Sequence, residues 1–222
     1  MRLIVLAAGQ GFKLDGFNKA LIQDPATGET VLARYLRLFA GWDVTVVVGY
    51  GAIRIMSAYP TLDYVYNAEW SLTGNSYSLG LALDERPSLV VSSDLFFDEP
   101  MVELIAASPP NAAVVVRSEN KRVQSVRGRL EGAIVTETYL GEPRDPGDVE
   151  TTGIYKVSDA DLLREWKRRC ARNRGAFAGL TLPLEGRNVH AVDTRELFLH
   201  EVNDPFDYLA LIRRRKDGPR PE

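Results

Sequence analysis

Two glycines and two lysines directly follow the first apolar run of the chain. Gly9 and Gly11 come straight after the run, and Lys13 and Lys19 lie in the same loop. Glycines after a strand let backbone N–H groups approach a phosphate chain without interference from a Cβ atom. The two lysines add the positive charge that a triphosphate needs. The segment is therefore predicted to bind phosphates, with an ordinary strand-to-helix turn as the simpler alternative.

Two well-known phosphate loops do not fit this segment. Leu14 stands where the dinucleotide fingerprint has its third glycine, and the Gly-Lys-Ser/Thr of the P-loop is absent. Asp24 lies too close to the loop, in a turn beside a proline, to be the ribose-binding acid of a dinucleotide enzyme. A dinucleotide-dependent oxidoreductase is therefore disfavoured, and a nucleotide-binding regulator without catalysis stays open as an alternative.

Polar residues that suit a metal ion and a nucleobase follow two later segments. Asp94 comes just past an apolar strand, and an acidic residue that faces a phosphate loop from there is a good Mg²⁺ ligand. Asn75 and Ser76 follow Thr73-Gly74 at a turn, where they can hydrogen-bond a pyrimidine edge. One asparagine amide supplies both a donor and an acceptor, which suits cytosine. Either residue could instead cap the helix that follows.

The elements that must position these residues are short β-branched runs that alternate with longer amphipathic stretches. The alternation predicts an α/β fold with three layers, α/β/α, around a mixed and mostly parallel sheet with right-handed crossovers. In such a sheet ligands bind beyond the carboxyl ends of the strands, where the loop, the turn and Asp94 would meet. Strands are predicted at 3–6, 44–48, 64–66, 88–91, 112–116, 123–126, 133–139 and 152–157, and helices at 30–39, 76–83 and 159–172.

Length and composition set the limits of this interpretation. The 222 residues, 45% hydrophobic and 26% charged, suffice for one large folded domain and exclude a disordered chain. Residues 1–212 are predicted to form that domain, with a hairpin-rich section at about 111–157, and the polar residues 213–222 a flexible tail. The net charge of −3 provides no positive field for nucleic acid. The single cysteine, Cys170, and the absence of a long apolar run predict a cytoplasmic protein with no membrane partner.

The first loop resembles a known family. Leu6-Ala7-Ala8-Gly9-x-Gly11 followed by Lys19-Ala20-Leu21 is similar to the signature loop of the nucleotidyltransferase superfamily. The resemblance implies a Rossmann-like nucleotidyltransferase fold in which this loop wraps the triphosphate and Lys19 supports the phosphates. One departure is that the first basic position, commonly arginine in the family, is Lys13. Lys13 and Lys19 are the expected catalytic residues.

The second resemblance narrows the family. Tyr66-Asn67 and the segment from Thr73 to Leu79 are similar to a stretch of bacterial phosphocholine and phosphonate cytidylyltransferases. Family position also implies a second Mg²⁺ ligand, Asn203, beside Asp94. The nucleotide-binding residues that follow are Leu6, Ala7, Ala8, Gly9, Gln10, Gly11, Phe12, Asn67, Gly74, Asn75, Ser76 and Ser93. The acceptor-binding residues, with the section at about 111–157 as the acceptor side, are Arg117, Glu150, Thr152 and Lys156.

The expected reaction is therefore transfer of CMP from CTP to a small anionic acceptor. The sequence of the loop from Gly11 to Lys19 is most similar to that of cytidylyltransferases of phosphonate and phosphinate antibiotic biosynthesis. This resemblance implies that the acceptor is a phosphonate such as phosphonoformate or 2-hydroxyethylphosphonate. A phosphocholine cytidylyltransferase and a sugar-1-phosphate or molybdopterin-type nucleotidyltransferase are the alternatives. The acceptor is already an anion, so no strong general base is needed. A basic mouth formed by Lys121, Arg122, Arg127 and Arg129 is weighed against a solvated hairpin face, which is the favoured interpretation.

Overall fold

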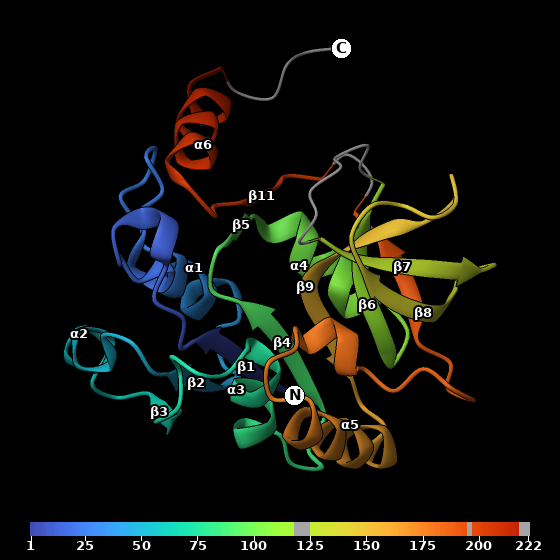
Figure 1. The fold of residues 1–222 in the computed structure, drawn as a ribbon. Helices are drawn as coiled ribbons and strands as arrows, with labels where there is room; N and C mark the ends of the chain where they lie inside the picture. The colour runs from blue at the N-terminus through green and yellow to red at the C-terminus, as the bar shows by residue number, and fades with distance from the viewer. Residues whose placement is uncertain (118–124, 195–196, 218–222) are drawn as a thin grey trace.

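The computed structural model describes residues 1–117, 125–194 and 197–217 (Figure 1). Within them, one nine-stranded sheet has the order β3-β2-β1-β4-β9-β6-β10-β8-β7, and a small second sheet pairs β5 with β11. The strands of the large sheet are β1 (Arg2–Ala7), β2 (Asp43–Val48), β3 (Asp63–Tyr66), β4 (Ser88–Ser92), β6 (Asn111–Val116), β7 (Val126–Glu131), β8 (Ile134–Leu140), β9 (Val149–Val157) and β10 (His190–Asp193). Those of the small sheet are β5 (Leu95–Phe97) and β11 (Leu199–Glu201).

The sheet is mixed, as the sequence predicts. Strands β1 to β4 run parallel to one another. β1, β4 and the second half of β2 are buried on both faces and rich in Val, Leu and Ile, whereas β3 is a partly exposed edge strand. Strand β9 enters antiparallel between β4 and β6, and β10 then pairs in parallel with β6. The hairpin β7–β8 completes the far edge. The direction of β9 decides which of its residues can reach the site described below.

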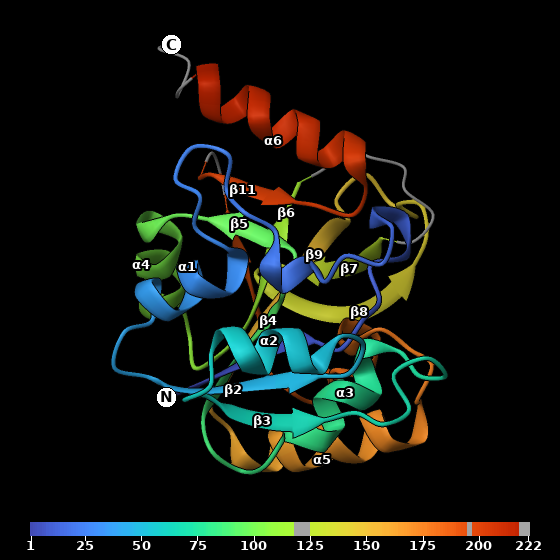
Figure 2. The same cartoon turned by 90° about the vertical axis from the view of Figure 1, so that its left-hand side faces the viewer.

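Two hydrophobic cores lie on opposite faces of β1 and make the three layers. Leu3 and Val5 belong to the core under α1 (Val31–Leu38), α2 (Ala52–Ala58) and α4 (Glu99–Ala107). Ile4 and Leu6 belong to the core under α3 (Asn75–Ala82) and α5 (Ala160–Arg172). The alternation follows from the two-residue period of a strand. Figure 2 shows α1 and α4 on one side of the sheet and α3 and α5 on the other.

Two of the three predicted helices, α1 and α5, begin where capping side chains place them, whereas α3 begins after Gly74 without a side-chain cap. The Thr30 side chain accepts a hydrogen bond from the Ala33 N–H, and Asp159 accepts two from the first turn of α5. The amphipathic pattern did not predict α2 or α4. The first two residues of the strand predicted at 123–126 lie outside the described residues, and β7 begins at Val126. Within the described ranges, the longest apolar stretch of any helix is too short to cross a membrane.

The C-terminal segment differs from the prediction. Helix α6 (Pro205–Asp217) continues past residue 212, so the expectation of a flexible tail from residue 213 is wrong as far as residue 217. The physical reason is an ion-pair contact: Arg215 pairs with Asp24 and Asp98 on the body of the protein. Composition alone could not show these partners. In Figures 1 and 2, α6 lies at the periphery beside β11.

Candidate active site

One cavity of about 810 Å³ opens beyond the carboxyl ends of β1 and β4. Its walls come from the loop after β1, the turn before α3, the segment after β4, the start of β7, the first half of β9, the segment after α5 and the residues between β11 and α6. Most of the residues predicted from the sequence line it: Leu6, Ala8, Gly9, Gly11, Phe12, Lys13, Lys19, Gly74, Asn75, Ser93, Asp94, Glu150, Thr152 and Asn203. Ala7 and Gln10 belong to the same strand and loop without lining the cavity.

The loop after β1 leaves its backbone donors available. The N–H groups of residues 9–13 make no hydrogen bond to any other residue that the structure describes. Gly11 has φ of 60°, and a Cβ there would lie 2.2 Å from the carbonyl oxygen of Phe17. Gly11 is therefore needed for the loop itself, whereas the space beside Gly9 is open. A row of free N–H groups of this kind is a site for an anion.

Asn18 places Lys19 at the cavity, a role that the sequence analysis did not assign to it. Its side-chain N–H donates to the carbonyl oxygens of Ala7 and Tyr50, both at 3.2 Å. Its side-chain oxygen accepts from the Ala20 N–H at 3.0 Å and so caps η2 (Lys19–Leu21). Asn18 is buried. A preference of asparagine for helix N-caps was the available signal.

Three residues far apart in the sequence converge at one point of the cavity. The Lys19 ammonium lies 2.8 Å from Asp94 Oδ2 and 2.7 Å from Asn203 Oδ1. Asp94 and Asn203 are held together by two backbone contacts beside them. Strand β5 pairs with β11, and the Val202 N–H donates to the Asp94 carbonyl oxygen. The carboxylate and the amide that were predicted as metal ligands therefore both face one cation.

The arrangement fits a divalent cation. Asp94 Oδ1 is buried, and no described residue hydrogen-bonds it. Carboxylate and amide oxygens are ligands that Mg²⁺ accepts, and it usually completes its shell with water and substrate phosphates. Among the described residues, no cluster of three or more acidic, histidine or cysteine side chains offers an alternative metal site.

The turn before α3 is tied to the segment that follows α5. The Gly74 N–H donates to the Arg174 carbonyl oxygen at 2.7 Å, and the Ala178 N–H donates to Asn75 Oδ1 at 2.7 Å. A Cβ at Gly74 would lie 2.3 Å from the Ala176 carbonyl oxygen, so only glycine allows this approach. The Asn75 amide oxygen therefore already accepts one hydrogen bond, whereas its N–H₂ group donates to none of the described residues.

The first half of β9 forms the other end of the cavity. One Glu150 carboxylate oxygen accepts from Ser125 Oγ at 2.6 Å, and the other lies 3.3 Å from the buried guanidinium of Arg127. Thr152 lines the cavity, and its hydroxyl donates to the Val114 carbonyl oxygen at 3.0 Å. This end therefore presents a carboxylate held in place by an arginine.

Two predicted nucleotide-binding residues lie behind the site. Asn67 is fully buried, and its side-chain N–H donates to Thr73 Oγ1 and Ser78 Oγ. Ser76 is also fully buried, with its hydroxyl on Thr181. Both side chains hold the turn before α3 in place, and neither reaches the cavity. Their assignment to nucleotide contact is corrected to support of the turn.

Two predicted acceptor-binding residues are also absent from the cavity wall. The Arg117 side chain is largely exposed and pairs with Asp193 at 3.1 Å. The Lys156 ammonium donates to the carbonyl oxygens at the end of α4, 2.8 Å from that of Ser108, and burial lowers the pKa of Lys156. Strand β9 runs antiparallel, so Lys156 pairs near the beginning of β4, away from the ligand edge.

The basic mouth does not form from the residues that the structure describes. Arg127 is fully buried beside Glu150, and Arg129 pairs with Asp145 at 2.8 Å. Lys121 and Arg122 lie outside the described residues. The residues assigned from the sequence also leave out other residues that line the cavity, in regular elements and in loops alike: Trp70, Thr73, Ser78, Ser92, Ser125, Phe177, Ala178, Gly179, Glu201 and Asp204.

Residues 3–180 match the MobA-like NTP transferase domain, and this span is most of the chain. The chain belongs to that family. The expected membership of the nucleotidyltransferase superfamily is confirmed. This family member is 27% identical to the CMP-5'-(3-aminopropyl)phosphonate synthase of Streptomyces rubellomurinus (strain ATCC 31215). The match covers 93% of the chain and 37% of the relative, so the chain spans just over a third of the relative's length.

Solved structures show the same fold. The CTP:phosphocholine cytidylyltransferase of Streptococcus pneumoniae superposes with a TM-score of 0.75 at 16% identity, over 96% of this chain and 97% of that one. The inositol-1-phosphate CTP transferase of T. maritima gives 0.71 at 16% identity, over 98% and 96%. A putative glucose-1-phosphate thymidylyltransferase of Bacillus anthracis gives 0.70 at 15% identity, over 100% and 98%. The nucleotidyltransferase fold predicted from the sequence is confirmed.

Proposed function

We propose that this chain is a CTP-dependent cytidylyltransferase that joins CMP to a small phosphonate and releases pyrophosphate. The observation that carries the proposal is the meeting of Lys19, Asp94 and Asn203 in the same cavity as the free N–H groups of residues 9–13. Such a combination suits a triphosphate and a cation. The phosphonate acceptor is supported by the name of the Streptomyces relative.

In the proposed reaction an acceptor oxygen attacks the α-phosphorus of CTP. A bond forms between that oxygen and phosphorus, and the bond from phosphorus to the oxygen that bridges to the β-phosphate breaks. The acceptor is already an anion, so no proton has to be removed. The backbone N–H groups of the loop donate to the phosphates, and Lys13 and Lys19 oppose the charge that develops on the leaving pyrophosphate. Catalysis then rests on positioning and charge.

Asp94 and Asn203 are the residues that would hold Mg²⁺. When bound, the ion supplies charge neutralisation at the phosphates. Asn203 is a neutral ligand, so only one protein carboxylate contributes charge. We therefore expect the nucleotide's own oxygens to account for much of the affinity.

Asn75 is the proposed contact to the base. Its oxygen is held by the Ala178 N–H, so its N–H₂ group is the part that donates, and a pyrimidine carbonyl oxygen is the matching acceptor. Glu150 and Thr152 are the proposed acceptor contacts, since both line the end of the cavity formed by β9. A carboxylate there suits an acceptor that carries an amino group as well as a phosphonate.

A pyrophosphate-release screen tests the proposal. Each of the four nucleoside triphosphates is combined with 3-aminopropylphosphonate, phosphonoformate, 2-hydroxyethylphosphonate, phosphocholine or glucose 1-phosphate, in Mg²⁺ buffer. We expect release with CTP and a phosphonate, and its loss in the Asp94→Asn variant. Release with a purine triphosphate alone, or only with glucose 1-phosphate, would contradict the assignment. Release with CTP and phosphocholine only would show that the acceptor is phosphocholine and not a phosphonate, while CTP would stay the assigned nucleotide.

A further inference from the structure

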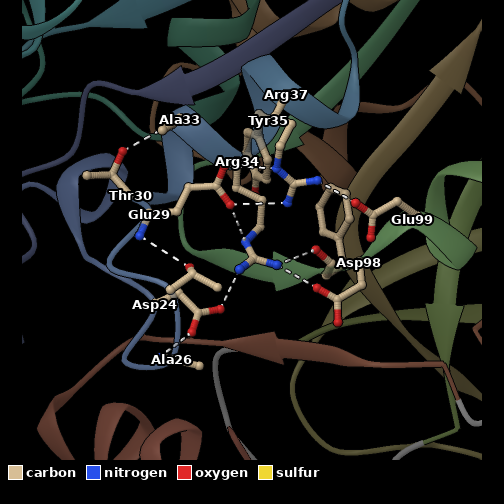
Figure 3. Close-up of polar contacts among 12 residues, drawn as sticks. Asp24, Ala26, Glu29, Thr30, Ala33, Arg34, Tyr35, Arg37, Asp98 and Glu99 are labelled. Atoms are coloured by element: carbon tan, nitrogen blue, oxygen red, sulfur yellow. Dashed lines mark hydrogen bonds and ion pairs between the residues drawn. The ribbon is translucent and has the colours of Figure 1, made fainter.

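Two arginines and two aspartates form a cluster away from the cavity, which we call the charge cluster: Asp24, Arg34, Asp98 and Arg215. Arg34 lies 2.5 Å from Asp24 Oδ2 through one nitrogen and 2.5 Å from Asp98 Oδ1 through another. Arg215 bridges the same two carboxylates, at 2.8 Å from Asp24 and 3.0 Å from Asp98. Figure 3 shows Arg34 between the two aspartates.

The charge cluster is largely removed from solvent. The side chains of Asp24 and Arg34 are 0% and 3% exposed, and that of Arg215 is 19% exposed. Burial raises the pKa of Asp98, but the hydrogen bonds from Arg215 and Arg34 outweigh it and lower that pKa. Arg215 also packs over the ring of Phe198, 4.0 Å from its centroid. A contact of this kind holds two surfaces in one arrangement, because a shift of either leaves a buried charge short of its partner.

The charge cluster connects the same three segments that meet in the active site. Each segment carries one residue of the site and one of the cluster: Lys19 and Asp24, Asp94 and Asp98, and Asn203 and Arg215. The first pair is joined by η2 and the two residues after it, the second by β5, and the third by α6. The three chain segments are thus in contact at two places, the cation site and the charge cluster.

We infer that Arg215 is a positioning residue for the cation site, acting through α6 on Asn203. The inference rests on the proposed function only in taking Asp94 and Asn203 as cation ligands. Asn203 lies just before α6, and Arg215 lies in its last turn, so the helix transmits the fixed position of one to the other. Without Arg215, Tyr208 still donates to the Gln23 carbonyl oxygen at 3.2 Å. Helix α6 also keeps the hydrogen bond from Arg214 to the Leu199 carbonyl oxygen at 3.1 Å and the buried side chain of Leu211. It loses its bridge to the two carboxylates, which lie on the segments that carry Lys19 and Asp94.

The test is a titration of the purified full chain with Mn²⁺ in the absence of nucleotide. The electron paramagnetic resonance signal of free Mn²⁺ measures how much of the ion is bound. Arg215→Met should fold, because both carboxylates keep Arg34 as a partner. We expect its Kd for Mn²⁺ to rise about fivefold or more, the lower range of couplings between two sites. Arg213→Met is the matched control, since Arg213 is exposed on the same helix and should leave the Kd unchanged.

A second variant and a second measurement separate positioning from loss of folding. Arg215→Lys keeps a cation but cannot bridge both carboxylates with a planar fork, so its Kd should lie between those of wild type and Arg215→Met. With an active chain, the Mg²⁺ concentration for half-maximal rate should rise while kcat at saturating Mg²⁺ stays within about twofold. A wild-type Kd for Mn²⁺ in both Arg215 variants would overturn the inference. If Arg215→Met does not fold, Arg215→Lys decides: a raised Kd supports the inference and an unchanged one overturns it.

A failure of this inference is distinguishable from a failure of the proposed function. Wild-type chain that binds Mn²⁺ while releasing no pyrophosphate would contradict the function and leave the role of Arg215 to be read from the Kd values. Wild-type chain that binds Mn²⁺ neither alone nor with CTP would contradict the cation site and, with it, the positioning role; if Mn²⁺ binds only with CTP, the Kd values of the variants are compared in its presence.

Discussion

Replacing Lys19 by methionine should strengthen metal binding while it slows catalysis. In the structure the Lys19 ammonium occupies the point on which Asp94 and Asn203 converge, at 2.8 and 2.7 Å. A cation that binds there without nucleotide must therefore displace the ammonium. Methionine keeps most of the length and apolar packing of the lysine stem but removes the charge.

The magnitude follows from the contacts that the ammonium makes. A hydrogen bond to a charged group contributes about 1.5–3 kcal/mol net, and the Lys19 and Asp94 side chains are only 20% and 15% exposed. Releasing this competition should tighten Mn²⁺ binding about ten- to a hundredfold, at about 1.4 kcal/mol per tenfold. Loss of a preorganised charge at the phosphates should slow turnover by about two orders of magnitude, or about 3 kcal/mol.

Mn²⁺ titration without CTP, together with pyrophosphate release, measures both effects. Lys13→Met is the control, because Lys13 is an exposed lysine of the same cavity. In the described structure Asp94 and Asn203 contact Lys19 and not Lys13. We expect the control to lose turnover but to keep the wild-type Kd for Mn²⁺. An unchanged or weaker Mn²⁺ affinity in Lys19→Met would refute the view that the ammonium and the metal share one place.

Three further predictions concern the base contact, the charge cluster and acid stability. Asn75→Asp keeps the acceptor for the Ala178 N–H but loses the donor, so kcat/KM for CTP should fall about tenfold or more with the melting temperature unchanged. Arg34→Met should lower the free energy of unfolding by about 3 kcal/mol in urea, whereas the exposed Arg37→Met should change it by less than about 1 kcal/mol. The pKa of Asp98 is lowered by folding, so its stabilising effect is present above about pH 4 and is lost as the pH falls through the folded pKa. Wild type should therefore lose more stability than Asp98→Asn on acidification, and parallel curves would contradict this.

The parts of the fold that the sequence predicted are those with strong local patterns. The parallel strands are runs of β-branched residues, and α1 and α5 carry both an apolar face and a capping residue at their first turn. The phosphate loop was found because glycines directly after a buried strand favour close approach of a ligand to the backbone. The local sequence pattern was therefore enough to predict the part of the site that the loop after β1 supplies.

The remainder depended on strand direction and on contacts between distant segments. Thr152 and Lys156 lie on one strand, yet only Thr152 reaches the cavity, because β9 runs against its neighbours and carries Lys156 to the opposite edge. The orientation of the Asn75 amide is set by Ala178, which is distant in sequence. Arg215 was predicted to lie in a flexible polar tail, because its partners are far away along the chain. Residue types do not specify such pairings.

The pairing of β5 with β11 joins an early segment of the chain to a late one, so the cation site forms late in synthesis. The large sheet has all its strands once β10 emerges, at Asp193, but Asn203 follows later and Arg215 later still. A nascent chain can thus acquire its layered body while the metal-holding corner stays open. Both residues also lie beyond the 3–180 span that matches the family.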